Sequence, residues 1–231
     1  LEIFFSCLLI GAIPVILPYS LKEYELNQIT DEINFSLIVS AWDKLKQIKL
    51  TQVITCPIEE LSHSSSGCSI KDVKSDFKNH ETQLILLTSG TTGSPKAVEL
   101  SANNLIESSK SWNKIINFTE DDTFICSLPL YHIGGLSIVI RSIIYKYNML
   151  LFDKFDVTKI VNECNSVNNL ISVVPSMLNE LVKTDDGINF ANKFRAIIMS
   201  GGPAPDSLLN KIIKYNLPVY KSYGMTETSS G

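Results

Sequence analysis

The segment Leu84–Lys96 reads Leu-Ile-Leu-Leu-Thr-Ser-Gly-Thr-Thr-Gly-Ser-Pro-Lys, and its residue types suit the binding of a polyphosphate. Glycine permits positive φ and close backbone approach, hydroxyl and backbone N–H groups donate hydrogen bonds, and the lysine adds positive charge. The residues that would make these contacts are Thr88, Ser89, Gly90, Thr91, Thr92, Gly93 and Lys96. The segment is not a Walker A loop, because Ser94-Pro95 follows Gly93. The turn of a β-hairpin is the alternative interpretation.

Arg141 is a second residue whose type suggests chemistry, because the chain has only two arginines, Arg141 and Arg195. It interrupts the apolar stretch Leu136–Ile144. A buried guanidinium needs a partner, which an internal salt bridge or a snorkelling side chain would satisfy. A substrate anion would satisfy it as well, because the planar fork of donors matches a carboxylate. The sequence leaves these alternatives open.

Short apolar segments alternate with helical stretches from Ile13 onward, which predicts βαβ units in a layered α/β fold with parallel-rich sheets and flanking helices. Because ligands in such folds bind at the carboxyl ends of strands, segments that follow strands are expected to converge there. The predicted strands are Ile13–Leu17, Ser36–Val39, Gln52–Thr55, Leu84–Thr88, Thr123–Leu128, Met149–Phe152, Leu170–Val174, Arg195–Ser200 and Val219–Ser222. The predicted helices are one ending near Gly11, then Leu21–Ile33, Ala102–Asn117 (capped by Ser101), Leu136–Tyr147, Val157–Asn165 (capped by Asp156), Ser176–Lys183 and Asp206–Tyr215.

Composition narrows the class of protein. With 231 residues, 45% hydrophobic and 19% charged, the chain is typical of a globular protein, and its net charge of −4 does not favour nonspecific nucleic-acid binding. The five cysteines lack CxxC spacing, so they indicate neither a zinc site nor a disulfide framework, and reduced thiols in the cytoplasm are expected. The apolar residues 1–17 are interrupted by Gly11 and Pro14 and lack a basic flank, which fits neither a signal peptide nor a membrane span. The sequence leaves open whether the protein forms a homo-oligomer.

Three motifs resemble those of the adenylate-forming superfamily, which includes acyl-CoA synthetases, luciferases and peptide-synthetase adenylation domains. They are Thr88–Lys96, Leu128-Pro-Leu-Tyr-His-Ile-Gly-Gly135 and Tyr223-Gly-Met-Thr-Glu-Thr228, and they occur in the family's order over about 140 residues. The resemblance implies the family's large N-terminal domain and the activation of a carboxylic acid by ATP with Mg²⁺, followed by thioester formation with coenzyme A. Because the chain starts at Leu1 and stops at Gly231, right after a motif, we expect both ends to be cuts through a longer protein. The ribose-binding Asp, the hinge and the lid domain with its catalytic lysine are expected beyond Gly231.

The resemblance also implies roles for single residues. The loop with Lys96 would bind the β- and γ-phosphates, Thr226 would contact the α-phosphate, Glu227 would bind Mg²⁺, and Tyr223 would stack on adenine. His132 would border the acyl pocket, where gating is expected rather than general-base chemistry, and Gly201-Gly202 would leave room for the nucleotide, with Gly202 also near the acid. Each role has a structural alternative. Lys96 could be a surface lysine and His132 a hydrogen-bonded core histidine. Glu227 could be a carboxylate at a helix N-terminus, Tyr223 a buried aromatic residue and Gly201-Gly202 a plain turn.

Within the superfamily the resemblance is strongest to the o-succinylbenzoate–CoA ligases of menaquinone synthesis. It rests on Leu128–Arg141, Asp153-Lys-Phe-Asp156 and Lys96-Ala-Val98. Such a substrate has two carboxylates, which gives Arg141 a second anion to bind. Another acyl or aryl acid–CoA ligase and a non-catalytic adenylate-binding module are the alternatives. We divide the chain into a first α/β part (residues 1–61), a surface connection (62–81) and a second α/β part (82–231) that carries the motifs.

Overall fold

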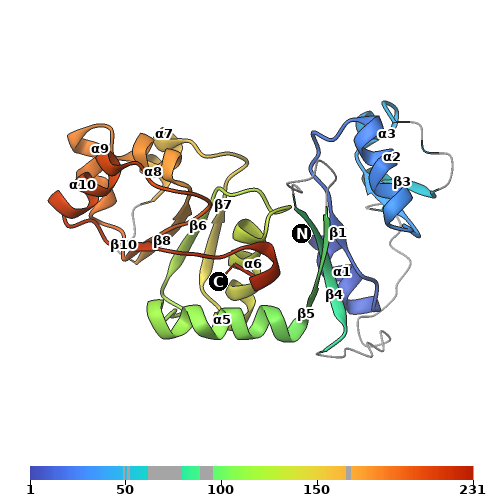
Figure 1. The fold of residues 1–231 in the computed structure, drawn as a ribbon, viewed down its shortest axis with the longest axis horizontal. Coiled ribbons are helices and arrows are strands. Elements are labelled where there is room, and N and C mark those ends of the chain that lie inside the picture. The colour runs from blue at the N-terminus through green and yellow to red at the C-terminus, as the bar shows by residue number, and fades with distance from the viewer. Residues whose placement is uncertain (49, 51–52, 62–79, 89–95, 165–167, 231) are drawn as a thin grey trace.

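The computed structural model describes residues 1–48, 50, 53–61, 80–88, 96–164 and 168–230 (Figure 1). The helices are α1 Glu2–Ile10, α2 Glu23–Glu32, α3 Trp42–Leu45, α4 Ile58–Leu61, α5 Ala102–Ile116, α6 Ile133–Tyr145, α7 Val157–Glu163, α8 Pro175–Leu181, α9 Asp185–Ala191, α10 Asp206–Lys214 and the 3-10 turn η2 Thr226–Thr228. The strands are β1 Val15–Ile16, β2 Ile38–Ser40, β3 Thr55–Pro57, β4 Thr82–Thr88, β5 Lys96–Ser101, β6 Thr123–Cys126, β7 Asn148–Leu151, β8 Asn169–Val173, β9 Ala196–Met199 and β10 Val219–Lys221.

Five strands form one parallel sheet in the order β10-β9-β8-β6-β7, which confirms the predicted parallel α/β fold. Alternate residues along these strands face two separate cores. Phe124, Leu170 and Ile198 pack against α5 and α6, whereas Ile125, Ile171 and Ile197 pack against α7, α8 and α10. The sheet is therefore covered by helices on both faces, as Figure 1 shows.

A second sheet joins β1, β4 and β5 and carries the predicted phosphate loop. Strand β1 pairs parallel with β4, and β4 pairs antiparallel with β5, from Thr82 opposite Ser101 to Thr88 opposite Lys96. The sequence prediction missed strand β5 and its antiparallel pairing with β4. Strands β4 and β5 thus form a β-hairpin, and residues 89–95, which join them, lie outside the described residues.

The remaining predicted elements agree with the structure within a few residues. Strand β3 begins at Thr55, where the predicted strand Gln52–Thr55 was expected to end, and it pairs parallel with β2. Helices α3, α4 and α9 were not predicted. Most of the expected surface connection lies outside the described residues, so the division of the chain stays a prediction, although β1 and β4 from its two sides share one sheet.

The described ranges contain no helix long and apolar enough to cross a membrane. Cys7, Cys56, Cys126 and Cys164 are unpaired thiols, and Cys68 lies outside those ranges. Burial raises the pKa of the Cys126 thiol to about 11, so at neutral pH it is a protonated packing residue.

Candidate functional site

Three of the predicted site segments follow strands of the five-stranded sheet. His132 comes after β6, Gly201-Gly202 after β9 and Tyr223 after β10. Because these strands are parallel, the three segments leave the sheet at the same edge, the one formed by its carboxyl ends. The expected convergence of these segments at one sheet edge follows from the topology.

The phosphate-loop segment belongs to the other sheet. Lys96 is the first residue of β5, and its exposed side chain has no ion pair or hydrogen bond in the described ranges. Its backbone is fixed, because it pairs with Thr88, whose Oγ1 donates to the Lys96 carbonyl oxygen at 3.4 Å. Ser89, Gly90, Thr91, Thr92 and Gly93 lie outside the described residues.

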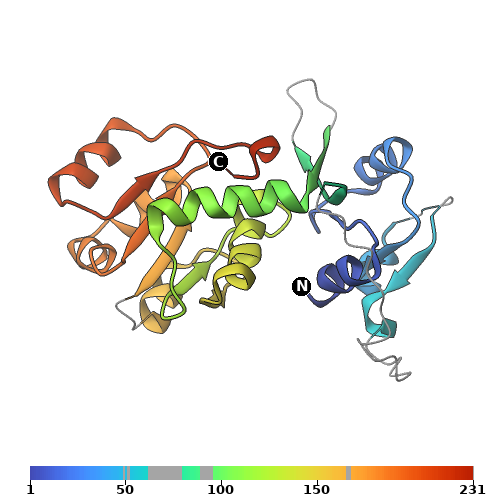
Figure 2. The same ribbon diagram turned by 90° about the horizontal axis from the view of Figure 1, so that it is seen from below.

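The C-terminal segment Tyr223–Ser230 connects the two sheets. It leaves β10, passes along α5 and brings η2 against β5, as both Figure 1 and Figure 2 show. Thr226 and Glu227, the first residues of η2, therefore lie beside the strand that begins with Lys96. Strand β5 and a motif about 130 residues later in sequence are therefore neighbours in the fold.

Tyr223 and Glu227 face solvent. The Tyr223 side chain is 93% exposed, which excludes the buried-aromatic alternative and leaves a ring face open for stacking. The exposed Glu227 carboxylate has no hydrogen bond or ion pair within the described part of the chain. It lines a polar hollow of about 230 Å³ between α5 and η2, together with Asn103, Asn104, Glu107, Ser108, Ser111, Thr228 and Ser229. An unpaired carboxylate beside open space suits Mg²⁺, which prefers carboxylate, phosphate and water oxygens.

His132 is the N-cap residue of α6 and is exposed, so it is not a core histidine. Its ring lies 4.5 Å from the Tyr131 ring, and partial burial lowers the pKa of the imidazole below its usual 6.5, so the ring is mostly neutral at pH 7. The first turn of α6 packs against the hairpin, where Ile133 and Leu136 share a core with Leu84, Leu86 and Leu100. This packing holds the His132 segment beside the sheet that carries the phosphate loop.

The glycine pair after β9 has an unusual backbone. Gly201 adopts φ 85°, and a Cβ there would lie 2.9 Å from Cγ1 of Val174, so a side chain is excluded by both strain and crowding. Gly202 adopts φ 152°, and a Cβ there would meet no atom within 4 Å. The space beside Gly202 is open, as expected if a ligand passes there.

Arg141 is buried, with only 3% of its surface exposed. Its guanidinium carbon lies 5.3 Å from the centre of the Trp112 ring, over the indole face. Among the described residues it has no carboxylate partner, and its Nε and Nη2 atoms have no acceptor. The structure therefore speaks against both a salt bridge and a snorkelling side chain. Burial lowers the pKa of Arg141 to about 10, so the group stays charged at pH 7.

Two residues that hold the C-terminal segment were not found from the sequence. Ser108 and Trp112 lie one turn apart on α5 and bind the end of the C-terminal segment: Ser108 Oγ donates to the Ser229 carbonyl at 2.7 Å, and Trp112 Nε1 donates to the Ser230 carbonyl at 3.1 Å. The only sequence signal was a serine and a tryptophan on the apolar face of a predicted helix. Nothing in a single sequence pairs them with residues about 120 positions later.

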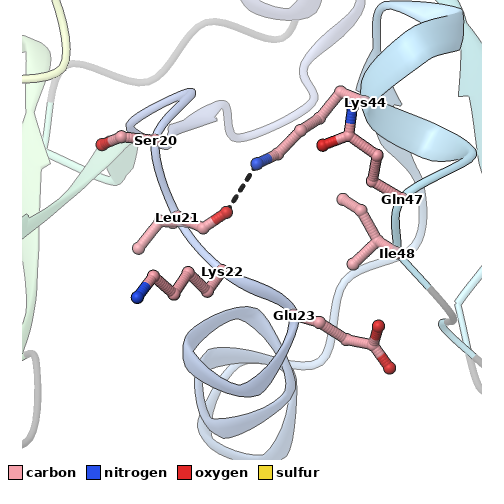
Figure 3. A pocket seen from close by; sticks show the side chains of 7 residues that line it. All are labelled: Ser20, Leu21, Lys22, Glu23, Lys44, Gln47 and Ile48. Carbon is pink, nitrogen blue, oxygen red and sulfur yellow. Dashed lines mark hydrogen bonds between the residues drawn. The ribbon is translucent and has the colours of Figure 1, made fainter.

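Another hollow, of about 350 Å³, lies between the loop before α2 and helix α3 (Figure 3). None of the residues that line it is a predicted site residue. Two lysines, Lys22 and Lys44, line it, and Lys44 donates to the Leu21 carbonyl at 2.6 Å and lies over the Tyr19 ring, so the Lys44 charge is already engaged. The predicted motifs and this hollow therefore belong to different parts of the molecule.

Known proteins give the context for this geometry. The chain is 34% identical over its whole length to a 2-succinylbenzoate–CoA ligase from Oceanobacillus iheyensis and covers 48% of that protein. It is 32% identical to a protein of the same name from Bacillus cereus, with 96% of this chain and 45% of that protein covered. The chain thus spans about half the length of the curated relatives it matches.

Solved structures agree with the fold. The o-succinylbenzoate CoA synthetase (MenE) from Bacillus subtilis, in complex with the acyl-adenylate intermediate OSB-AMP, superposes with a TM-score of 0.82 at 29% identity, covering 99% of this chain and 46% of that one. ATP-bound MatB from Rhodopseudomonas palustris superposes with a TM-score of 0.86 at 24% identity over 98% of this chain and 47% of that one, a likeness of fold. The family model described as "AMP-binding enzyme" matches residues 1–231. The chain therefore belongs to the family of AMP-binding enzymes, the adenylate-forming superfamily that its three motifs indicated.

Proposed function

We propose that this protein activates o-succinylbenzoate with ATP and joins the acyl group to coenzyme A. One carboxylate oxygen attacks the α-phosphorus of ATP, the bond to the bridging oxygen breaks, and pyrophosphate leaves. The product is an acyl-adenylate. The coenzyme A sulfur then attacks the acyl carbon and loses its proton, and AMP leaves with the former carboxylate oxygen.

The observation that carries this proposal is the contact between η2 and β5. It sets Thr226 and Glu227 beside the strand that begins with Lys96, so a hydroxyl, a carboxylate and an ammonium group from distant motifs can meet one polyphosphate. Hydroxyl and ammonium groups donate to phosphate oxygens, which is the electrostatic stabilisation that phosphoryl chemistry needs. Glu227 would hold Mg²⁺, which neutralises phosphate charge when bound.

The nucleotide base is assigned to the exposed ring of Tyr223 and the glycine turn after β9. An aromatic side chain that is 93% exposed leaves a face for adenine. The open space beside Gly202 lets a ligand approach the backbone, and the φ of 152° at Gly202 favours glycine. The acyl pocket would begin at His132, whose mostly neutral imidazole suits contact with an uncharged part of the acid.

Arg141 supports the substrate class, an acid with a second anionic group. A buried, charged guanidinium with two unpaired nitrogen donors is costly unless an anion satisfies it. Gly134 lies seven residues earlier, about two helical turns away on the same face of α6, and it presents no side chain there. We assign to Arg141 the carboxylate of o-succinylbenzoate that does not react, bound directly or through water.

The relatives support the same substrate, because the ligases from Oceanobacillus iheyensis and Bacillus cereus are named for 2-succinylbenzoate and the Bacillus subtilis structure contains OSB-AMP. A further structure of that enzyme contains ATP and a magnesium ion. We assign the reaction to the cytoplasm, where ATP and coenzyme A are both available.

A screen of acids tests the reaction. The protein is incubated with ATP, Mg²⁺, coenzyme A and single acids, and both pyrophosphate release and acyl-CoA are measured. We expect the highest kcat/KM with o-succinylbenzoate. A preference for a monocarboxylic acid would make the protein a different acyl-CoA ligase, and ATP binding without turnover of any acid would make it a non-catalytic adenylate-binding module.

Arg141→Gln tests the assignment of the acid. Loss of a charge-assisted contact to a carboxylate is expected to cost about 1.5–3 kcal/mol, or about 10- to 150-fold in kcat/KM. The loss should occur with o-succinylbenzoate and be absent with an analogue lacking the aromatic carboxylate. Lys146→Gln, which removes an exposed charge just after the same helix, is the control and should change neither value. Equal losses with both acids would make Arg141 structural.

A further inference from the structure

The segment Met225–Ser230 forms a compact turn, called the C-terminal turn below. Ser229 N donates to the Thr226 carbonyl at 3.0 Å, and Ser230 N donates to the Met225 carbonyl at 3.2 Å. Ser229 and Ser230 both adopt left-handed backbone conformations, with φ 54° and 77°. This backbone conformation costs free energy for residues other than glycine, so it persists only where contacts with the surroundings stabilise it.

Helix α5 supplies that support through two side chains. Ser108 and Trp112 are spaced four residues apart and so lie on one face of the helix, and their hydrogen bonds end on the two consecutive carbonyls of Ser229 and Ser230. Trp112 is 7% exposed and Ser229 only 2%, so solvent does not compete strongly for these bonds. The C-terminal turn contains Thr226 and Glu227, so its position fixes theirs.

Trp112 makes a second contact that Ser108 does not. The guanidinium of Arg141 lies 5.3 Å from the centre of the indole ring, on its face, while the indole N–H points to Ser230. One rigid, planar side chain thus touches the proposed acid-binding cation and the segment that carries Thr226 and Glu227. An anion that binds the guanidinium draws it toward itself and reduces its attraction to the ring, because that attraction depends on the positive charge.

We propose that Trp112 is a positioning residue that couples the binding of the substrate's second carboxylate at Arg141 to the placement of Thr226 and Glu227. The proposal rests on the function proposed above. The indole already donates to the Ser230 carbonyl, so a shift of the guanidinium on its face when an acid binds reaches the C-terminal turn through this one side chain. Ser108 anchors the same C-terminal turn through its bond to the Ser229 carbonyl.

A set of variants separates coupling from simple anchoring. Trp112→Phe keeps an aromatic ring and removes the N–H, and we expect kcat for adenylate formation from o-succinylbenzoate to fall roughly 3- to 10-fold, as for one buried hydrogen bond, with KM for ATP changed less than about twofold. In the Arg141→Gln background the same substitution should have almost no further effect. Ser108→Ala should lower kcat by a similar factor in both backgrounds, because it acts independently.

The outcomes distinguish the two proposals. If the wild type does not adenylate o-succinylbenzoate or another diacid, the proposed function fails and the coupling fails with it. If it does, but Trp112→Phe lowers kcat equally in the wild-type and Arg141→Gln backgrounds, only the coupling is refuted. Trp42→Phe, on the exposed helix α3, is the control for loss of a tryptophan and should leave kcat unchanged.

Fluorescence provides a second readout that does not need an active variant. The acid is added to the protein in the presence of α,β-methylene-ATP, and the emission of wild type is compared with that of Arg141→Gln and Trp112→Phe. We expect a change in tryptophan emission with the wild type, because the cation above the indole moves, and none with either variant. An identical change in all three proteins would overturn the coupling, even if Trp112→Phe proved unstable in the kinetic assay.

Discussion

The predicted site residues divide by exposure, and the division matches the ligand parts assigned to them. Lys96, Tyr223 and Glu227 are exposed, with charged or aromatic groups free to meet a large polar nucleotide. Arg141 is buried, where the effective dielectric is lower and an anion is bound more strongly. A buried guanidinium discriminates against acids that lack a second anionic group, because its hydrogen-bond donors are then left unpaired.

Lys96→Ala tests the phosphate assignment at the residue scale. Removing the ammonium group from a phosphate contact should cost about 1.5–3 kcal/mol, or about 10- to 150-fold in ATP affinity or in kcat/KM for adenylation. Calorimetric titration of ATP·Mg and a pyrophosphate assay measure these values. Lys193→Ala, an exposed lysine near the amino end of β9 and the opposite edge of the sheet, is the matched control. Unchanged affinity and unchanged rate in Lys96→Ala would remove the assignment.

The second arginine, Arg195, has a structural role. It binds Asp122 through Nε at 2.7 Å and Nη2 at 2.6 Å, and its Nη1 donates to the Ile116 carbonyl at the end of α5. The Asp122 side chain is only 1% exposed, whereas that of Arg195 is 31% exposed. The pair ties α5 to the amino ends of β6 and β9.

Arg195→Leu should therefore destabilise the fold by about 3–5 kcal/mol, because it leaves a buried carboxylate without its cation. The free energy of unfolding is measured by urea denaturation, read from the midpoint at constant m. Glu120→Gln breaks the exposed pair between Glu120 and Lys146, 3.6 Å apart, and should cost less than about 1 kcal/mol. Similar losses in the two variants would show that burial does not set the strength of the Arg195 pair.

At the scale of elements, the sequence predicted best where a cap or a long apolar pattern marks an element. Ser101 caps α5 by accepting from Asn104 N, and Asp156 caps α7 by accepting from Lys159 N, both as predicted. The buried strands of the parallel sheet read as apolar runs because both faces are covered by helices. These local signals do not depend on distant parts of the chain.

Strand β5 was missed for a physical reason. In Lys96–Ser101 only Val98 and Leu100 pack into the core, and they alternate with Ala97, Glu99 and Ser101 at an edge of a three-stranded sheet. Such a short alternation is indistinguishable from a loop until its pairing with β4 is known. The glycine- and hydroxyl-rich sequence after β4 favoured ligand binding, and a segment that joins two paired strands can also bind phosphate.

The short elements and the site contacts were missed for the same reason. Helix α9 spans seven residues and η2 only three, too few for a helical period to emerge. The hydrogen bonds from Ser108 and Trp112 to Ser229 and Ser230 depend on tertiary packing. The sequence predicted which residues form the motifs, but not which helix holds them in place.

The glycine pair at the start of α6 gives a prediction for this element. A Cβ at Gly135 would overlap the Pro129 carbonyl, whereas one at Gly134 would lie 3.5 Å from Leu128 Cδ1, an ordinary contact. Gly135→Ala should push the Pro129–His132 turn away, lower the melting temperature and reduce acid activation. Gly134→Ala, with the same change in composition, should retain the fold and gain up to about 1 kcal/mol from helix propensity. If both variants keep wild-type stability and activity, the Pro129–His132 turn can shift to make room for a Cβ at Gly135, and the argument from packing is wrong.

At the scale of the whole molecule, two sheets with different topologies carry the residues of the proposed site. The parallel sheet delivers His132, Gly201-Gly202 and Tyr223 at its carboxyl edge, and the hairpin sheet delivers Lys96. The α6 core and the C-terminal segment join them, since Ile133 packs on the hairpin and η2 reaches β5. A nucleotide between the sheets would contact both, so its binding should strengthen their association.

The exposure of this site gives a last prediction, for the 231 residues by themselves. They span about half the length of the related ligases, and Tyr223, Glu227 and Lys96 face solvent. An open site leaves an acyl-adenylate accessible to water and leaves coenzyme A without a fixed approach, and both effects slow thioester formation. We expect the 231-residue protein to form acyl-CoA on the order of 100-fold or more slowly than the full-length Oceanobacillus iheyensis ligase under identical conditions, while still binding ATP·Mg. Measuring acyl-CoA by chromatography alongside ATP binding by calorimetry separates the two properties. Matching rates would mean that these residues contain everything that thioester formation requires.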